Sequence, residues 1–184
     1  LIFMFAGLTG TKTDEESARK FKSINEQGLV NLLDCIVKKK STAKIIFPST
    51  RLVYKGVKDK FLNEDDLKET KTPYALSKLN GEAILANYNN SFGVKYTTFR
   101  ICVPFGNEFD EDYSYGTIGF FLSKAKKGEN ITLYGDGSLK RTFTHVNDIV
   151  RIIVESSIDD RSNNKIYNIG GKDNLSLKNL ASII

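Results

Sequence analysis

Apolar runs alternate with amphipathic stretches along the first part of the chain. Residues 1–6, 43–47 and 94–103 are runs rich in apolar and β-branched residues, and they are followed by Gly7, Pro48 and Pro104. Continuous apolar runs are typical of parallel strands that are covered on both faces. We therefore predict three buried strands, each ended by a glycine or a proline.

Two helices are predicted between these strands. Residues 14–37 begin with an acidic turn, end at the lysines 38–40, and carry one stripe at helical spacing: Phe21, Ile24, Asn25, Gly28, Leu29, Leu32, Leu33 and Ile36. Glycine in a helix interior costs stability, so we expect a close backbone approach at Gly28. Residues 73–88 form the second helix, with a stripe of Leu76, Leu79, Ala83 and Tyr88. The alternation of strands and helices predicts an α/β fold with a parallel sheet.

The second part of the chain has shorter elements. We predict a helix at 117–127, a strand at 131–134 with its turn at 135–137, and a half-exposed strand at 141–144. A helix at 146–156, a strand at 165–169 and a final helix from 175 follow. Residues 1–103 are assigned to the sheet domain and 104–184 to a smaller lobe, with the 165–171 strand as a candidate to return to the main sheet.

Composition and charge exclude several classes of function. The 184 residues are 40% hydrophobic and 27% charged, as in soluble globular proteins, and no run is long enough to span a membrane. The net charge of +5 comes mainly from scattered lysines, a pattern that disfavours nucleic-acid binding. His145 is the only histidine, which excludes a histidine-rich metal site. Cys35 and Cys102 lie outside any CxxC motif, and we interpret both as reduced core thiols of a cytoplasmic protein.

Tyr74 and Lys78 are the most informative pair. Thr72 suits the N-cap of the second helix and Pro73 its first position, which places Tyr74 and Lys78 at i and i+4 on one face. A lysine held beside a tyrosine favours the phenolate, which is then a usable base. On this stretch alone, a solvated pair on a surface helix is equally compatible with the sequence.

Tyr54 and Lys58 show the same spacing. This second pair follows a strand, contains Gly56 and lacks a helical stripe, so we interpret it as a chance match. Its presence shows that the spacing by itself is weakly specific.

The position of the first pair in the fold strengthens the functional interpretation. Ligands of open α/β sheets bind beyond the carboxyl ends of the strands. Ser49 and Thr50 lie at such an end, so Thr50 and the start of the Tyr74 helix are expected to share one crevice. Asn25 lies on the buried stripe of the other helix, and a buried amide needs partners. It either orients a neighbour or is a satisfied structural amide, and both interpretations stay open.

The order and spacing of these segments resemble the extended short-chain dehydrogenase/reductases, specifically the nucleotide-sugar epimerase/dehydratase family. The similar segments are residues 5–8, 25–28, 47–54, 73–78, 134–137, 141–148 and 167–171. The resemblance implies a Rossmann-type, doubly wound parallel sheet with a small C-terminal substrate lobe. The N-terminal βαβ part of that fold, with its glycine-rich loop, is expected to lie outside these residues.

The resemblance also implies roles. Tyr74 is the base that takes a proton from a sugar hydroxyl while a hydride passes to NAD, Thr50 hydrogen-bonds the same oxygen, and Lys78 binds the nicotinamide ribose. Asn25 supports this catalytic group, and NADP is not excluded as the cofactor. The residues implied to lie along the dinucleotide are Phe5, Ala6, Gly7, Tyr74, Lys78 and Val103. Tyr134 and Arg141 are implied to bind a nucleotide-sugar substrate, although Arg141 also fits a surface strand residue. Relatives dimerise through the two helices at 14–37 and 73–88, so a homodimer is expected.

Two departures from the family pattern bear on which of the family's activities is expected. Arg51 and Leu52 follow Thr50 where dehydratases typically carry an Asp-Glu pair, which argues against dehydration. Val103 replaces an asparagine that contacts the substrate phosphates in many relatives. We therefore favour an NAD-dependent nucleotide-sugar epimerase that transiently oxidises a sugar hydroxyl. A keto-sugar-nucleotide reductase and a non-catalytic, truncated member are the alternatives.

Overall fold

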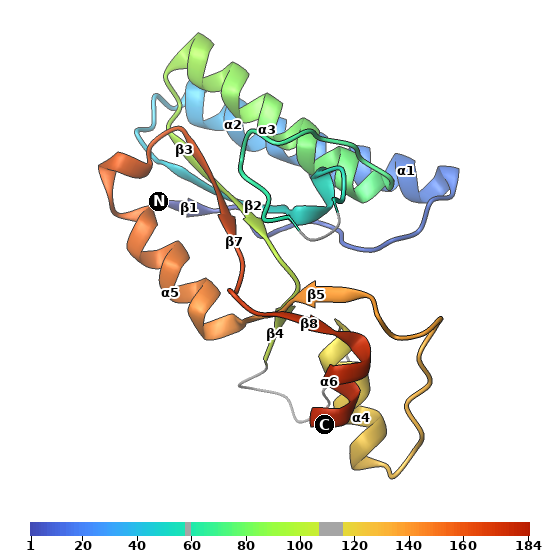
Figure 1. The fold of residues 1–184 in the computed structure, drawn as a ribbon. Helices are drawn as coiled ribbons and strands as arrows, with labels where there is room; N and C mark the ends of the chain where they lie inside the picture. The colour runs from blue at the N-terminus through green and yellow to red at the C-terminus, as the bar shows by residue number, and fades with distance from the viewer. Residues whose placement is uncertain (58–59, 107–115) are drawn as a thin grey trace. The chain divides into compact units, whose positions relative to one another are not determined.

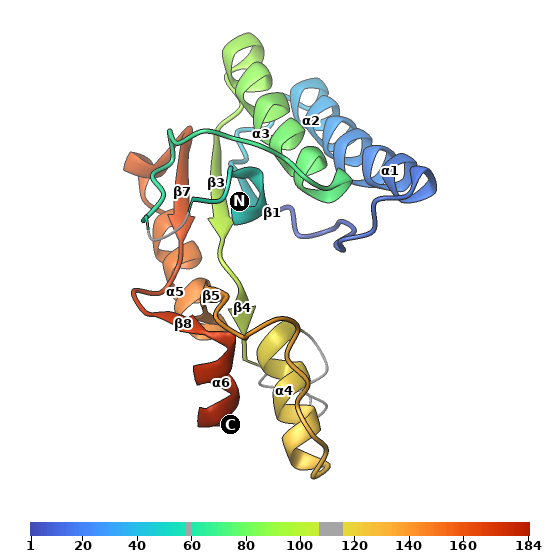
Figure 2. The same ribbon diagram turned by 45° about the vertical axis from the view of Figure 1, so that its right-hand side comes forward.

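Four strands form one sheet in the computed structural model, which describes residues 1–57, 60–106 and 116–184. The strand order is β1 (Ile2–Phe3), β2 (Ile45–Thr50), β3 (Tyr96–Ile101) and β7 (Lys165–Ile169). β1 runs parallel to β2, with Ile2 opposite Ile45. The helices α1 (Glu15–Phe21), α2 (Gly28–Lys38) and α3 (Pro73–Phe92) lie side by side along one face of this sheet (Figures 1 and 2). The predicted α/β class with a parallel sheet is confirmed.

The chain divides into two compact units. The first contains residues 1–100 and 155–168, and the second contains residues 101–154 and 169–184. β7, the strand expected at 165–169, is a strand of the main sheet. Lys58 and most of the predicted loop at 105–115 lie outside the described residues.

The core of the first unit fills the space between helices and sheet. Its buried members come from α2, β2, α3, the start of β3 and the segment just before it: Leu29, Leu33, Ile36, Ile45, Phe47, Leu85, Val94 and Tyr96. The α2 members recur at helical spacing, so one face of that helix is apolar and packs inward. Burial of these side chains holds α2 and α3 on the sheet and so fixes the position of the residues they carry.

The predicted N-terminal strand is shorter and more exposed than expected. β1 covers only Ile2–Phe3, and Leu1, Phe3 and Phe5 are 56%, 46% and 54% exposed. β1 pairs only with β2 within the described sheet, so this edge is uncovered. The prediction that Pro48 ends the second strand is also wrong, because β2 continues to Thr50. β1 pairs with β2 only at Ile45 and Ile46, so the missing N–H of Pro48 breaks no bond to it.

The long first helix contains an irregular turn. Asp14 caps α1 by accepting a hydrogen bond from the Ser17 N–H, as the acidic start predicted, but residues 22–27 form a π-helix (η1, Lys22–Gln27). The wider turn leaves Ile24 43% exposed while Asn25 is buried, so Ile24 was wrongly placed on the buried stripe. The prediction of a close backbone approach at Gly28 is wrong. Within the described residues, a Cβ added to Gly28 would meet no atom within 4 Å outside its own helix backbone.

α3 buries a face that the apolar pattern did not identify. Thr72 accepts a hydrogen bond from the Ala75 N–H, which confirms the predicted N-cap, and Gly93 ends the helix in the left-handed conformation. The buried side carries Ala75, Ser77, Lys78, Gly81, Glu82 and Leu85, whereas Leu76 of the predicted stripe is 47% exposed. The apolar pattern missed this face because several of its buried side chains are polar. No described helix, this 20-residue one included, is long and apolar enough to cross a membrane.

The second unit contains short elements. They are β4 (Pro104–Phe105), α4 (Gly116–Lys126), β5 (Lys140–Thr142), β6 (Thr144–His145), β8 (Asn174–Ser176) and α6 (Leu177–Ile183), while α5 (Val146–Ser157) continues into the first unit. β4 pairs with β6 in parallel, and β5 pairs with β8 in antiparallel. The strand predicted at 131–134 is absent, since β8 takes the place beside β5. The N–H of Asn147 donates a hydrogen bond to His145 Nδ1, so the His145 side chain caps the start of α5.

The two cysteines differ in exposure. Cys35 is exposed on α2, so its interpretation as a core thiol is wrong, and Cys102 is partly buried. Both are free thiols.

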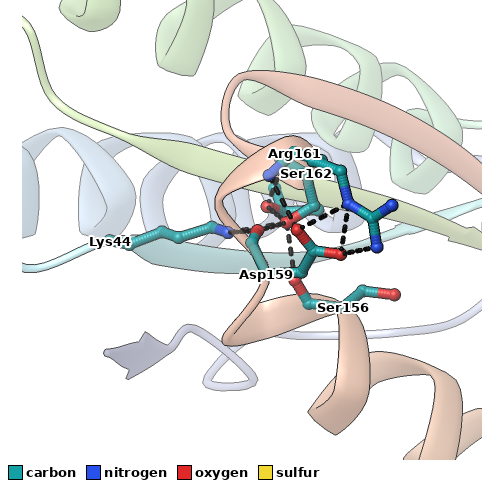
Figure 3. Close-up of polar contacts among 6 residues, drawn as sticks. Lys44, Ser156, Asp159, Arg161 and Ser162 are labelled. Atoms are coloured by element: carbon teal, nitrogen blue, oxygen red, sulfur yellow. Dashed lines mark hydrogen bonds and ion pairs between the residues drawn. The ribbon is translucent and has the colours of Figure 1, made fainter.

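Lys44 is a buried lysine immediately before β2, at the opposite end of that strand from Thr50. Its ammonium donates to Ser162 Oγ at 2.7 Å and to the Asp159 carbonyl at 3.4 Å (Figure 3). Ser162 Oγ also lies 2.5 Å from the Ser156 carbonyl at the end of α5. Burial lowers the pKa of Lys44, against the opposing charges of Asp160 and Asp159. The cluster binds the turn after α5 to the residue that precedes β2.

We expect Ser162→Ala to destabilise the protein by about 1–3 kcal/mol, because the buried ammonium of Lys44 would lose its nearest acceptor. Urea unfolding of the two proteins measures this loss. Ser91→Ala is the matched control, since Ser91 is exposed on α3. Equal midpoints for Ser162→Ala and the parent protein would show that the cluster contributes nothing.

Candidate active site

Tyr74 and Lys78 lie together at the start of α3. The Lys78 side chain is buried, with 8% of the residue exposed, and its Nζ is 6.0 Å from the centre of the Tyr74 ring. The Tyr74 ring is half-buried and packs against Phe21 of α1, with 5.8 Å between ring centres. The interpretation of Tyr74 and Lys78 as a solvated surface pair is therefore wrong for Lys78. The fold holds this side chain buried beside the phenol.

The environment of Lys78 is unusual for a lysine. Burial lowers its pKa from 10.5 to about 8. Within the described residues its ammonium has the ring faces of Phe47 and Tyr74 as neighbours and no hydrogen-bond acceptor. The side chain is buried among aromatic rings, and hydroxyl groups of a bound ligand would supply the hydrogen-bond acceptors that its ammonium lacks in the described chain.

The lowered pKa of Lys78 predicts how stability changes with pH. Below pH 8 the group is charged in the folded and unfolded chains, and its burial costs stability. Between about pH 8 and 10.5 only the unfolded chain keeps the proton, so stability rises with pH by up to about 3 kcal/mol. Lys78→Met should remove this rise, and it should be as stable as the parent protein or more stable at pH 7. Urea unfolding at pH 7, 8, 9 and 10 measures it, and parallel curves for the two proteins would contradict it.

Thr50 is the last residue of β2 and lies beside α3. α3 packs on β2 and on the short 3-10 helix η2 (Arg51–Val53) that follows it. The Thr50 residue is 7% exposed, and its Oγ1 accepts a hydrogen bond from the Leu52 N–H at 3.3 Å. Because the oxygen is used as an acceptor, the hydroxyl proton is oriented away from this amide and can be donated to a ligand.

Asn25 links the segment after β1 to α3. Its amide pairs with the backbone of Leu8 in both directions, at 2.8 and 3.0 Å, and its Nδ2 donates to Ser77 Oγ at 3.1 Å. Ser77 Oγ in turn donates to the Tyr74 carbonyl at 2.8 Å. Asn25 is therefore a satisfied amide that also orients its neighbours, so the two sequence interpretations combine.

The residues predicted to lie along the dinucleotide after β1 are exposed. Phe5, Ala6 and Gly7 follow β1, and Asn25 holds the next residue, Leu8. A side chain at Gly7 would place its Cβ 3.0 Å from Asn25 Oδ1, so the glycine allows this close approach. The segment is thus accessible and bound to the helix that carries Asn25.

A buried ionic network next to this group was missed by the sequence reasoning. Arg100 of β3 donates to Glu82 of α3 through Nε at 3.0 Å and Nη2 at 2.6 Å. Ser49, next to Thr50, donates to the same carboxylate at 2.5 Å. Arg100 and Glu82 are 3% and 5% exposed. The only signals in the sequence were a charge inside an apolar strand and a glutamate one turn after Lys78.

Tyr54 completes this network. Its hydroxyl accepts from Arg100 Nη1 and donates to Asn168 Oδ1, both at 2.6 Å. Burial raises the pKa of Tyr54. Burial alone would lower the pKa of Arg100, but the hydrogen bonds and charge of Glu82 outweigh it and raise the pKa. Tyr54 is thus a structural partner of an arginine, and no role as a base is implied by its spacing to Lys58.

The remaining predicted site residues belong to the second unit. Val103 follows β3 with φ of 20°, a strained conformation for a β-branched residue, and its carbonyl accepts from the Thr144 N–H at 3.1 Å. Tyr134 is 95% exposed, and Arg141 is half-buried on β5. Their roles toward cofactor and substrate stay predictions.

Residues 1–170 match the family described as the NAD dependent epimerase/dehydratase family. The UDP-N-acetyl-alpha-D-glucosaminuronate decarboxylase of Bacillus cytotoxicus is 30% identical over 189 aligned residues, which cover 100% of this chain and 58% of that protein. Other relatives of similar identity are nucleotide-sugar reductases and dehydratases.

The chain is also similar to solved structures of nucleotide-sugar epimerases. The UDP-N-acetylglucosamine 4-epimerase of Methanobrevibacter ruminantium, in complex with UDP-N-acetylmuramic acid, is 26% identical, with a TM-score of 0.87 over 98% of this chain and 58% of that one. The UDP-glucuronic acid 4-epimerase of Bacillus cereus, in complex with UDP-glucuronic acid and NAD, is 25% identical, with a TM-score of 0.84 over 97% and 57%.

The chain thus spans little more than half the length of the relatives it matches. The match nevertheless extends over β1 to β7 and includes Asn25, Thr50, Tyr74 and Lys78. The sequence resemblance is confirmed: the chain belongs to the NAD-dependent epimerase/dehydratase family of extended short-chain dehydrogenase/reductases.

Proposed function

We propose that the protein containing this chain is an NAD-dependent nucleotide-sugar epimerase that transiently oxidises a sugar hydroxyl. The observation that supports it most strongly is the buried Lys78 side chain beside the Tyr74 phenol, whose ammonium has ring faces but no acceptor around it in the described chain. Structural ion pairs have partners, whereas an ammonium held ready for ligand hydroxyls does not.

The residues present fit the nicotinamide end of NAD. When bound, NAD supplies the hydride acceptor for oxidation of the sugar carbon. Tyr74 takes the proton of the sugar hydroxyl as its base, and Thr50 donates a hydrogen bond to the same oxygen and stabilises its developing charge. Lys78 binds the ribose hydroxyls and favours the phenolate through its charge. Asn25 holds the start of α3, through Ser77, and the segment after β1, through Leu8, in fixed positions relative to each other.

The nucleotide-sugar substrate is proposed to bind Tyr134 and Arg141 of the second unit. A guanidinium can hold a diphosphate by two hydrogen bonds at once. Arg51 and Leu52 follow Thr50 and form the 3-10 turn η2, so no acid is present there to eliminate water as a dehydratase would. This favours epimerisation, with reduction of a keto-sugar nucleotide as the alternative.

A substrate panel with the full-length protein tests the proposal. Each nucleotide sugar would be incubated with NAD and followed by proton NMR of the anomeric region and by absorbance at the NADH maximum. An epimerase converts one sugar into its epimer without net NADH, a reductase consumes NADH only with a keto sugar, and a decarboxylase releases carbon dioxide from an acidic sugar. Failure of every sugar to react, with NAD bound, would favour the non-catalytic alternative.

A homodimer through α2 and α3 is also proposed. Ile24 and Leu76 are 43% and 47% exposed on helical segments that pack together in one layer, and burying such side chains in a two-fold contact would be favourable. Light scattering of the full-length protein, with Leu76→Glu as the disruptive variant, would decide between monomer and dimer.

A further inference from the structure

Phe47 lies directly against Lys78. Its ring comes from β2, three residues before Thr50, and only 3% of the residue is exposed. Lys78 Nζ is 4.9 Å from the centre of this ring, which is closer than its 6.0 Å to the centre of the Tyr74 ring. Both distances are within the range of cation–π attraction, in which the electron-rich ring face attracts an ammonium.

The position of the Phe47 ring depends on the absence of a side chain at Gly81. A Cβ added to Gly81 would lie 2.6 Å from Cζ of Phe47, well inside van der Waals contact. Gly81 is buried in the interior of α3, where alanine would be the better helix former. The absence of a side chain at Gly81 therefore allows the ring to lie between β2 and α3. Gly81 is about one helical turn after Lys78.

Among the residues that the structure describes, no carboxylate pairs with Lys78. Of the charged and titratable groups on the elements around it, Glu82 is bound by Arg100 and Ser49, and Tyr74 lies on the same helix one turn before. Asn25 is neutral and is bound to Leu8 and Ser77. The ring faces are thus the groups that can stabilise the charged form in the described chain.

We propose that Phe47 is a positioning residue, whose ring face binds the Lys78 ammonium and holds it beside Tyr74, and that Gly81 is required for the ring to reach it. The contact itself is independent of the reaction; its effect on turnover rests on the function proposed above.

Fluorination of Phe47 separates this role from simple packing. Fluorine withdraws electron density from the ring face at nearly constant size, so the full-length protein would be made with one, two or three fluorines on the Phe47 ring. The protonation of Lys78 would be followed by NMR of lysines labelled at Cε, with Lys78→Met identifying the signal. We expect the pKa of Lys78 to fall with each fluorine, by about 2- to 30-fold in the protonation constant over the series.

Phe99 is the matched control position, because it is fully buried in β3 and stacks on Tyr167. The same fluorines there should leave the Lys78 titration unchanged. An unchanged titration with three fluorines on Phe47, in a protein with the parent unfolding temperature, would overturn the proposal.

Gly81→Ala tests the second part. We expect the added methyl to displace the ring, which moves the Lys78 signal and raises the Kd for NAD. Ala83→Gly, at an exposed position of the same helix, controls for changed helix propensity. An unmoved Lys78 signal in Gly81→Ala would refute the requirement for glycine. If fluorination moves the titration but no sugar is turned over by the parent protein, the contact stands and the proposed function fails.

Discussion

Tyr74→Phe is expected to lower turnover by about 10²–10⁴-fold while NAD binding is kept, because a phenyl ring packs as the phenol does but cannot take a proton. The ring contact with Phe21 and the position of α3 are retained in this variant. The measurement is kcat with the reactive sugar from the substrate panel, together with the Kd for NAD from calorimetry. A change confined to KM would point to binding rather than proton transfer.

The control for this variant comes from the same helix. Tyr88 lies near the other end of α3, where its hydroxyl donates to Asp34 at an exposed position. Tyr88→Phe should therefore keep full turnover. Tyr54, despite its similar spacing to a lysine, is a poor control, since loss of its hydroxyl would break one buried hydrogen bond of Arg100 and one of Asn168. Turnover within a few fold of the parent in Tyr74→Phe would refute the assignment of the base.

Arg100→Met is expected to have the largest effect on stability, about 3–5 kcal/mol. Removal of the guanidinium leaves the Glu82 carboxylate buried without its cation, and it leaves the Glu64 carbonyl and the Tyr54 hydroxyl without their donor. Urea unfolding at neutral pH measures the loss. The Glu82 network lies one helical turn from Lys78, so activity should fall as well, through displacement of α3 from β2.

A double variant distinguishes a broken ion pair from poor packing. Arg100→Met combined with Glu82→Leu removes both charges, and we expect it to recover most of the lost stability, since a buried pair can be replaced by apolar groups at little cost. Arg151→Met is the exposed control, because its pair with Asp148 lies on the surface. A double variant as unstable as Arg100→Met would show that volume, and not charge, determines the effect.

The features that the sequence determined by itself are local. The N-cap by Thr72, the acidic start of α1 at Asp14, and the i, i+4 spacing of Tyr74 and Lys78 depend on residues within one or two turns of each other. The alternation of apolar runs with helical patterns was sufficient for the α/β class, because sheet and helix periods differ. The apolar pattern also placed Thr50 at a strand end, and it became a candidate site residue because ligands of such sheets bind beyond those ends.

Only the tertiary structure decided which charged residues are buried and which partners the buried amide of Asn25 has. Arg100 and Glu82 are 18 residues apart, and Tyr54 is 46 residues from Arg100. Asn25 reaches Ser77 across 52 residues. A charged side chain is predicted to be exposed until its partner is known, since its burial is favourable only when the partner is in place. For the same reason the apolar pattern placed the wrong face of α3 inward, and the contact of Lys78 with Phe47 emerged only when β2 and α3 were packed together.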